Sequence, residues 1–313
     1  MTSHEPAEDI FGFVGVTASQ SSINRVFPRW AEVLGLGEVT FDPIDLEVGI
    51  DPSAYRTVVE KMKDDPRYRG ALVTTHKVRL LDACRDLFDE LDPHAQLLGE
   101  VSCISKHDGR LWGHAKDPIT AGQSLEDFVP EGHFDRTDAH VLCLGAGGAG
   151  LAIAVYLLSG EAPAGTPERI VLVNRSPERL EECRRVLTEI GVMDAVELVA
   201  NEDPARNDQL CAQLPDGSMV INATGMGKDR PGSPITDDAI FPQQGLAWEL
   251  NYRGELDFLH QARRQQTHRS LIVEDGWRYF VYGWSAVVAE AFHLDLDTDT
   301  LEELSEQAAM VRT

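Results

Sequence analysis

The stretch over residues 141–179 constrains the fold of this chain more than any other. An apolar run at 141–144 leads into the turn Gly145-Ala-Gly-Gly-Ala-Gly150, a second apolar run reaches Leu158, and a β-branched run covers 170–173. This is the order of a strand, a glycine-rich turn, a helix and a second strand, in which a Gly-x-Gly-x-x-Gly pattern is far more specific than it is alone. The stretch predicts the dinucleotide-binding half of a doubly wound α/β fold.

The glycines of this turn have separate physical tasks. Gly145 allows a sharp turn at the end of the strand, Gly147 lets the backbone approach a pyrophosphate, and Gly150 lets the helix pack close to the strand. The first residues of the helix offer unpaired N–H groups to the diphosphate. We therefore expect Gly145, Gly147, Gly148 and Ala149 to bind the cofactor.

The end of the second strand distinguishes between two cofactors. Asn174 stands where an NAD site usually carries Asp or Glu, and Arg175, Ser176 and Arg179 follow it. A carboxylate repels a 2′-phosphate, whereas guanidinium, hydroxyl and amide groups bind one. These four residues predict NADP rather than NAD. Ser176 also precedes a proline, as a helix cap does, and the two roles are compatible.

The bulk composition limits the classes of partner. A formal net charge of −24 disfavours nucleic acid and anionic membranes. No apolar run approaches the roughly 20 residues that span a bilayer, and the polar, acidic start does not resemble a signal peptide. The 5 cysteines lack metal-ligand spacing, and the histidines are dispersed, so reduced thiols and no metal site are expected. We expect a cytoplasmic protein with a small-molecule ligand, either a monomer or a homodimer.

Two segments outside this stretch carry polar groups beside predicted elements. Thr17 and Ser19 precede a helix predicted from Asn24, where their donors can hold a carboxylate or simply cap the helix. Lys77 lies between a strand and a helix predicted over 78–91. Taken alone, it is more often a surface lysine than a poised one.

Taken together, these segments resemble the shikimate/quinate dehydrogenase family, in the same order and over nearly the whole chain. The family's Gly-Ala-Gly-Gly-Ala is matched at 145–149, its Asn-Arg-Ser-x-x-Arg at 174–179 and its Asn-Ala-Thr at 222–224. The resemblance implies an oxidoreductase of the kind used in aromatic amino acid biosynthesis.

The resemblance also implies two domains, for which 313 residues are sufficient. The expected arrangement is an N-terminal α/β substrate domain over 1–130 and an NADP-binding Rossmann domain over 138–276. The C-terminal helices, over 277–313, are expected to return to the first domain.

The same resemblance implies a set of site residues. The catalytic pair is Lys77 and Asp117, although Asp117 taken alone is a turn residue before a proline. The implied substrate contacts are Thr17, Ser19, Thr75, Ser102 and Tyr252, and the further cofactor contacts are Asn222, Ala223, Thr224 and Gly276. The loop before Lys77 lacks the family's proline, so Thr74 and Thr75 are both candidates for the family's threonine.

The predicted substrate shell departs from the family pattern. Thr17 replaces a serine, Ser102 and Ala115 replace asparagines, and Gly283 replaces a glutamine. Each lost hydrogen bond to a ring hydroxyl is worth on the order of 1 kcal/mol or more. We therefore expect a different or bulkier ring than shikimate. The aromatic character of residues 277–284 is consistent with a bulkier ring and equally with packing of the interior.

These observations predict an NADP-dependent oxidoreductase that interconverts a ring secondary alcohol and a ketone, on a hydroxy-cyclohexene carboxylate like shikimate. Lys77 would exchange the hydroxyl proton, with Asp117 as its partner. Two alternatives stay open: a dehydrogenase of an aminoshikimate or cyclitol analogue, and an NADP-binding sensor without dehydrogenase activity.

Overall fold

The computed structural model describes residues 8–228 and 230–311. Contacts divide the chain into two compact units. Unit 1 comprises the described residues up to Lys116 together with those from Val281 onward, and unit 2 runs from Asp117 to Phe280. Unit 1 is therefore discontinuous in sequence.

The first boundary, between Lys116 and Asp117, lies before residue 130, where the first domain is expected to end. Helix α5 (Asp117–Glu126) belongs to unit 2 because it packs on helix α6 (Gly148–Leu157). The contact is close at Gly122, where an added Cβ would come within 2.4 Å of the Tyr156 ring.

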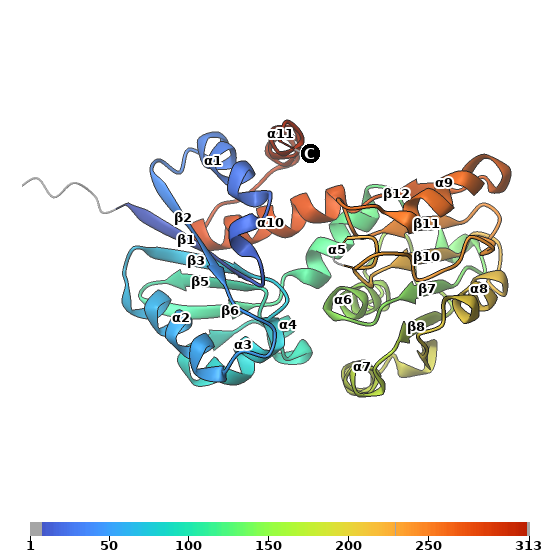
Figure 1. Ribbon diagram of the computed structural model, residues 1–313, viewed down its shortest axis with the longest axis horizontal. Coiled ribbons are helices and arrows are strands. Elements are labelled where there is room, and N and C mark those ends of the chain that lie inside the picture. Colours follow the sequence, from blue (N-terminus) through green and yellow to red (C-terminus); the bar gives the residue numbers. More distant parts are fainter. Residues whose placement is uncertain (1–7, 229, 312–313) are drawn as a thin grey trace, which may run out of the picture. The chain divides into compact units, whose positions relative to one another are not determined.

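The sheet of unit 1 mixes parallel and antiparallel strands (Figure 1). Its strands are β1 (Asp9–Gly15), β2 (Val39–Asp45), β3 (Tyr68–Val73), β4 (Glu90–Leu91), β5 (Cys103–His107) and β6 (Arg110–His114), in the order β2-β1-β3-β5-β6-β4. Strands β2, β1 and β3 are parallel, β5 is antiparallel to β3, and β6 is antiparallel to β5. The ends of β1, β2, β3 and β6 and the start of β5 therefore meet at one edge of the sheet, which we call the carboxyl edge of unit 1.

Helices cover both faces of this sheet. They are α1 (Ile23–Val33), α2 (Pro52–Asp64), α3 (Lys77–Cys84), α4 (Pro93–Leu98), the last part of α10 (Trp277–Phe292) and α11 (Thr298–Ala309). Side chains alternate along β1, so that Phe11 stacks on Phe27 of α1 and contacts Phe292 of α10, while Gly12 faces Met62 of α2 on the other side.

The predicted helix over 78–91 is too long. Helix α3 ends at Cys84, and the next residues form a 3₁₀ turn, Arg85–Leu87, before the short strand β4. The apolar spacing continues past the true end of the helix because Leu91 belongs to a strand that pairs with β6. Asp92 then caps a new helix, α4, by accepting from the N–H of Ala95 at 2.6 Å.

Unit 2 is a doubly wound parallel sheet. Its strands are β7 (Val141–Leu144), β8 (Ile170–Asn174), β9 (Val196–Ala200), β10 (Met219–Asn222), β11 (Leu246–Glu249) and β12 (Ile272–Glu274), in the order β12-β11-β10-β7-β8-β9. All pairings between them are parallel. Numbered along the chain, this is the Rossmann order 3-2-1-4-5-6, and the predicted fold class is therefore confirmed.

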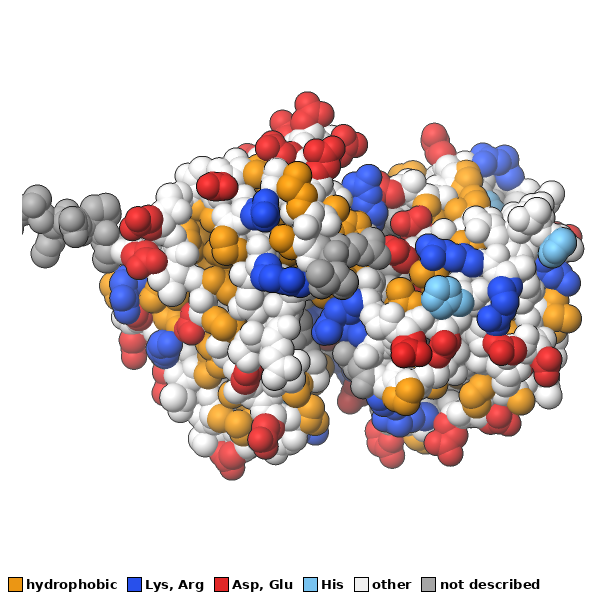
Figure 2. Space-filling model, turned by 45° about the horizontal axis from the view of Figure 1, so that its top comes forward, with side chains coloured by type: hydrophobic (Ala, Val, Ile, Leu, Met, Phe, Trp, Pro, Cys, Tyr) orange, Lys and Arg blue, Asp and Glu red, His pale blue; other side chains and the backbone are white. Residues whose placement is uncertain are grey.

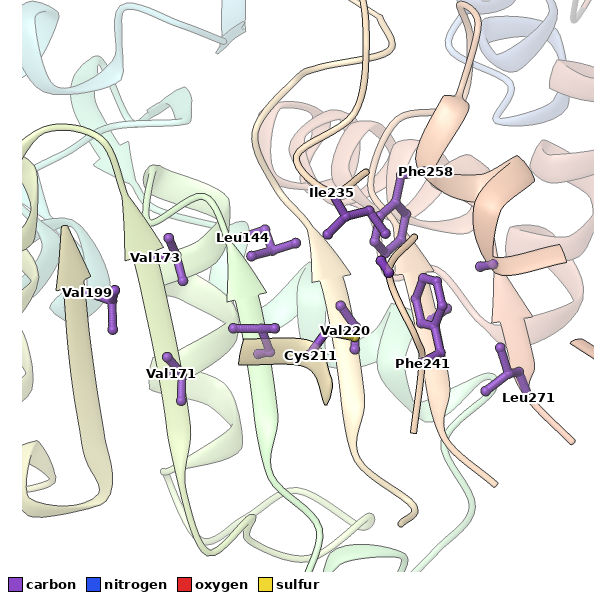
Figure 3. Close-up of a cluster of buried hydrophobic side chains, with 14 residues drawn as sticks. Leu144, Val171, Val173, Val199, Cys211, Val220, Ile235, Phe241, Phe258 and Leu271 are labelled. Carbon is purple, nitrogen blue, oxygen red and sulfur yellow. The ribbon is translucent and has the colours of Figure 1, made fainter. Parts of the chain in front are cut away.

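The core of unit 2 is formed by β-branched side chains of the strands and aromatic side chains of a loop and of α9 (Asp257–Arg269) (Figure 3). Val171 and Val173 of β8 and Val220 of β10 belong to one cluster that also contains Phe241 and Phe258. The remaining helices of the unit are α7 (Pro177–Glu189) and α8 (Pro204–Ala212). Burial of the strands on both faces explains why they read as continuous apolar runs.

Among residues 8–228 and 230–311, no helix is both long and apolar enough to cross a membrane. The cysteines, Cys84, Cys103, Cys143, Cys183 and Cys211, are buried free thiols.

Candidate active site

The glycine loop of unit 2 joins β7 to α6. Gly145 has a φ of +109°, and a Cβ there would lie 2.5 Å from the carbonyl oxygen of Ala223. A Cβ on Gly150 would lie 2.0 Å from the carbonyl oxygen of Gly145, so only glycine lets the helix pack this close to the strand. Gly147 is different, because a Cβ there meets no atom within 4 Å. The space above Gly147, at the start of α6, suits a group that approaches the backbone from outside.

A cavity of about 410 Å³ opens beside this loop. Its lining residues come from the carboxyl ends of β7, β8, β9 and β10 and from the segments that follow them. This edge includes the point between β7 and β10 where the strand order reverses and doubly wound sheets bind nucleotides. The predicted cofactor residues Gly145, Gly147, Asn174, Arg175, Ala223 and Thr224 line the cavity, whereas Gly148, Ala149, Ser176, Arg179, Asn222 and Gly276 are not among its lining residues.

The cavity also has lining residues that sequence reasoning missed. Asn201 and Glu202 directly follow β9, and the N–H of Asn201 donates to the carbonyl of Asn174 at 3.0 Å. Their position after a third parallel strand is a signal that the sequence does carry. Met226 and Arg230 come from a loop without periodicity, and the Arg230 guanidinium donates to the carbonyl of Thr224 at 3.4 Å.

Some polar residues of the turn after β8 make hydrogen bonds within the protein, and others line the cavity. The Asn174 side chain accepts from the N–H of Ser176 at 3.1 Å, and the Ser176 hydroxyl caps α7 by accepting from the N–H of Arg179 at 3.2 Å. The Arg179 guanidinium donates to the carbonyl of Ala146 at 3.0 Å and pairs with Glu182 at 2.5 Å. Arg179 therefore ties the glycine loop to α7, and exposed Arg175 is the guanidinium of this turn that reaches the cavity.

A buried carboxylate joins the ends of β10 and β11. Glu249 accepts from the side chain of Asn222 at 2.7 Å and from the backbone and side chain of Asn251 at 2.8 and 2.6 Å. Burial raises the pKa of Glu249 to about 7, although these donors act in the opposite direction. Asn222 in turn accepts from the N–H and hydroxyl of Thr224. Asn222 and Glu249 thus hold the loop that presents Thr224 to the cavity.

Tyr252 and Gly276 lie further along unit 2. The ring of half-buried Tyr252 packs on Phe280, with centroids 4.4 Å apart. A Cβ on Gly276 would lie 2.0 Å from the carbonyl oxygen of Leu250, so close backbone packing requires this glycine.

Unit 1 brings several predicted substrate residues to its carboxyl edge. The N–H of Thr74 donates to the carbonyl of Val14 at 3.0 Å, and the N–H of Val73 donates to that of Ser102 at 2.9 Å. Half-buried Lys77 begins α3 immediately beyond, and its carbonyl accepts from the N–H of Val101 at 3.3 Å.

His76 fixes the backbone next to Lys77. It is 2% exposed, its Nε2–H donates to the carbonyl of Leu46 at 2.9 Å, and its Nδ1 accepts from the Tyr55 hydroxyl at 2.9 Å. Burial lowers the pKa of His76, which favours the neutral ring that this pattern requires. Thr74 also donates its hydroxyl to Val14 at 3.4 Å, and Thr75 is exposed.

The loop after β1 carries Thr17 and Ser19, both exposed. The N–H of Ser19 donates to the carboxylate of Asp45 at 2.9 Å, and the Ser19 hydroxyl donates to the other oxygen of the same carboxylate. Asp45 is the last residue of β2 and was not singled out by sequence reasoning.

The end of β6 carries a second lysine. Lys116 pairs with Glu290 of α10 at 2.6 Å, and its N–H donates to the hydroxyl of buried Ser102 at 2.9 Å. Ser102 therefore accepts from the backbone of the segment that follows β6. Asp117, 9% exposed, follows Lys116 as the first residue of unit 2.

Known proteins resemble this chain over most of its length. The chain is 31% identical to the shikimate dehydrogenase (NADP(+)) of Lactococcus lactis subsp. cremoris (strain MG1363) over 226 residues, which cover 71% of this chain and 74% of that protein. No protein-family model matches it.

Solved structures show the same fold. Shikimate 5-dehydrogenase from Thermus thermophilus, in complex with NADP(H) and shikimate, matches with a TM-score of 0.68 and 23% identity, covering 96% of this chain and 99% of that one. The ligand-free 5-ketofructose reductase of Gluconobacter sp. strain CHM43 matches with a TM-score of 0.71 and 21% identity, covering 96% and 98%.

The doubly wound sheet, its glycine loop and the cavity at its switch point define a Rossmann-type dinucleotide-binding protein that carries a second α/β unit. Within that class, the chain belongs to the shikimate dehydrogenase family. The resemblance inferred from the motifs is thereby confirmed, and the relatives are oxidoreductases that act on an alcohol. The expectation of NADP agrees with the cofactor in their names.

Proposed function

We propose that this protein is an NADP-dependent oxidoreductase that interconverts a secondary alcohol and a ketone on a polyhydroxylated ring of the shikimate type. The observation that carries the proposal is Lys77, which begins α3 at the carboxyl edge of unit 1 in a chain whose other unit has a complete dinucleotide loop. Family membership supports the same reaction class.

The residues of unit 2 fit the cofactor. The open space at Gly147 and the N–H groups of α6 suit a diphosphate, and Arg175 in the same cavity suits a 2′-phosphate. When bound, NADP⁺ supplies the hydride acceptor. We assign Thr224 and Ala223 to its neighbourhood because they line the cavity on the other side of the glycine loop.

The proposed chemistry divides between hydride and proton transfer. In oxidation, the C–H bond of the carbinol carbon breaks and both its electrons leave with the hydride. The hydroxyl proton passes to the Nζ of Lys77 as the C=O bond forms, and in reduction Lys77 returns it. The resemblance to the family implies that Asp117 is the carboxylate partner of Lys77.

The fold alone leaves the substrate open, since it also supports a reductase named for 5-ketofructose. The test is reduction of NADP⁺, followed by nicotinamide absorbance, with shikimate, quinate and neutral cyclitols, and with NAD⁺ in parallel. Lys77→Ala is expected to lower kcat by about 10²-fold or more while NADP⁺ binding, measured by fluorescence, is unchanged. Arg175→Ala is expected to reduce the preference for NADP⁺ over NAD⁺.

Lys61→Ala is the matched control, since it removes a lysine of unit 1 that pairs with Asp42 at 3.0 Å near the end of α2. Its kcat should stay within about twofold of the wild type, as expected for a surface ion pair. Full activity of Lys77→Ala would show that the catalytic assignment is wrong. Binding of NADP⁺ without turnover of any ring alcohol would favour a sensor.

A further inference from the structure

The loop between β1 and α1 is built around a carboxylate that belongs to the chain itself. Asp45 pairs in register with Gly15, so its side chain lies beside the start of this loop. It accepts from the N–H of Ser19 at 2.9 Å and from the Ser19 hydroxyl. The backbone and side-chain donors of Ser19 therefore both bind one carboxylate.

The rest of the loop holds these donors in place. The side-chain amide of Asn24 donates to the carbonyls of Ala18 and Ser21, at 2.8 Å each, and so closes the loop on itself. Asp45 and Ser19 are both exposed, so the pair faces the solvent at the carboxyl edge of unit 1. The bonds from Ser19 lower the pKa of Asp45, which is therefore ionised at neutral pH.

We propose that Asp45 is a specificity-determining residue that takes the donors of the Ser19 loop and thereby selects a ring that presents a hydroxyl, rather than a carboxylate, to this loop. The inference rests on the proposed function and narrows its substrate to neutral polyhydroxylated rings. A carboxylate of the substrate at this loop would find the Ser19 donors already bonded to Asp45. It would also be repelled by the negative charge of Asp45. A hydroxyl donates to the free lone pairs of the Asp45 carboxylate.

The test uses two substrates that differ in charge at one position, shikimate and its methyl ester. Steady-state kinetics with NADP⁺ on the full-length protein give kcat/KM for both. For the wild type, kcat/KM for methyl shikimate is expected to exceed that for shikimate by at least about tenfold. In Asp45→Asn, kcat/KM for shikimate should rise at least about tenfold, because the neutral amide no longer repels the shikimate carboxylate. The ratio of kcat/KM for methyl shikimate to that for shikimate should therefore move toward one.

Asp297→Asn is the matched control. Asp297 is an exposed helix cap in unit 1 that accepts from the N–H of Thr300 at 2.9 Å, and Asn caps a helix as well as Asp does. This variant removes the same charge from the same unit and should leave the ratio unchanged.

The outcomes separate this inference from the proposed function. Equal or faster turnover of shikimate by the wild type would overturn the role of Asp45 and leave the oxidoreductase in place. An unchanged ratio in Asp45→Asn, with folding verified by circular dichroism, would also overturn it. If NADP⁺ binds but neither shikimate, its ester nor a cyclitol is turned over by any variant, both proposals fail.

Discussion

Glu249 shows how a single residue can make one unit sensitive to pH. It is fully buried at the end of β11 and accepts three hydrogen bonds, one from Asn222 and two from Asn251. Its pKa is raised to about 7, mainly by burial. The folded protein therefore holds this proton more tightly than the unfolded chain does, and ionisation near neutral pH weighs against the folded state.

The sign of the pH dependence follows directly. The stabilising contribution of protonated Glu249 is complete below its ordinary pKa of 4.5 and is lost as the pH rises through about 7. Glu249→Gln does not titrate at this position. Relative to this variant, the free energy of unfolding of the wild type should fall by on the order of 3 kcal/mol between acidic and mildly alkaline pH. Urea unfolding of both proteins at pH 5, 6, 7 and 8 measures this difference. A difference that stays constant across the series would refute the assignment.

At the level of secondary-structure elements, the glycine loop combines two different demands. Gly150 is required by packing, because its Cβ would overlap the carbonyl of Gly145. Gly147 has an extended backbone, with φ −74° and ψ −166°, and open space, so packing alone does not require glycine there. In the proposed cofactor site, the diphosphate requires glycine at position 147.

Two alanine variants separate these demands. Gly150→Ala should destabilise the protein by about 1–3 kcal/mol, because the steric overlap outweighs the gain of roughly 1 kcal/mol in helix propensity. Gly147→Ala should change the free energy of unfolding by less than about 1 kcal/mol and weaken NADPH binding at least about tenfold. Thermal unfolding and a fluorescence titration of NADPH measure the two effects. An unchanged affinity of Gly147→Ala for NADPH would show that the diphosphate does not bind at this loop.

Across the molecule as a whole, the chain passes from unit 1 to unit 2 and back. Unit 1 depends on contacts between its two distant segments, such as the bond from the Trp30 indole N–H to the carbonyl of Leu304 at 2.8 Å. Unit 1 therefore cannot complete its core until the C-terminal segment is present. Unit 2 is continuous and meets no such constraint.

The net charge is also a property of the molecule as a whole. The sequence has 52 acidic and 28 basic residues, and acidic side chains recur over the face seen in Figure 2, with basic ones between them. Net repulsion destabilises a compact state, and about 0.15 M salt screens charges beyond roughly 8 Å. The midpoint of thermal unfolding should rise by a few degrees, roughly, between low salt and 0.15 M NaCl at constant pH. A falling midpoint in calorimetry would mean that attractive ion pairs dominate.

Much of the fold could be predicted because its signals are local. Strand, glycine turn and helix follow one another within 141–158, and Gly150 is required by the carbonyl of Gly145, five residues earlier. The contact that requires Gly145 comes from Ala223, which is distant in sequence. The end of α3 was missed because Leu91 continues the apolar spacing, although it belongs to a strand that pairs with distant β6.

The amino-acid sequence alone was sufficient for the family and for the Rossmann character of unit 2, because periodicity and motif spacing express these features within short segments. The assignment of Lys77 came from the resemblance to the family and stays a prediction. The hydrogen-bond partners of the polar side chains are determined only in the tertiary structure. Arg179 binds the glycine loop, Ser102 binds the backbone of Lys116 and Ser19 binds Asp45. Asp45 is 26 residues from Ser19. The loop after β1 reaches Asp45 because β1 and β2 pair in this register, and no spacing along the chain encodes that register.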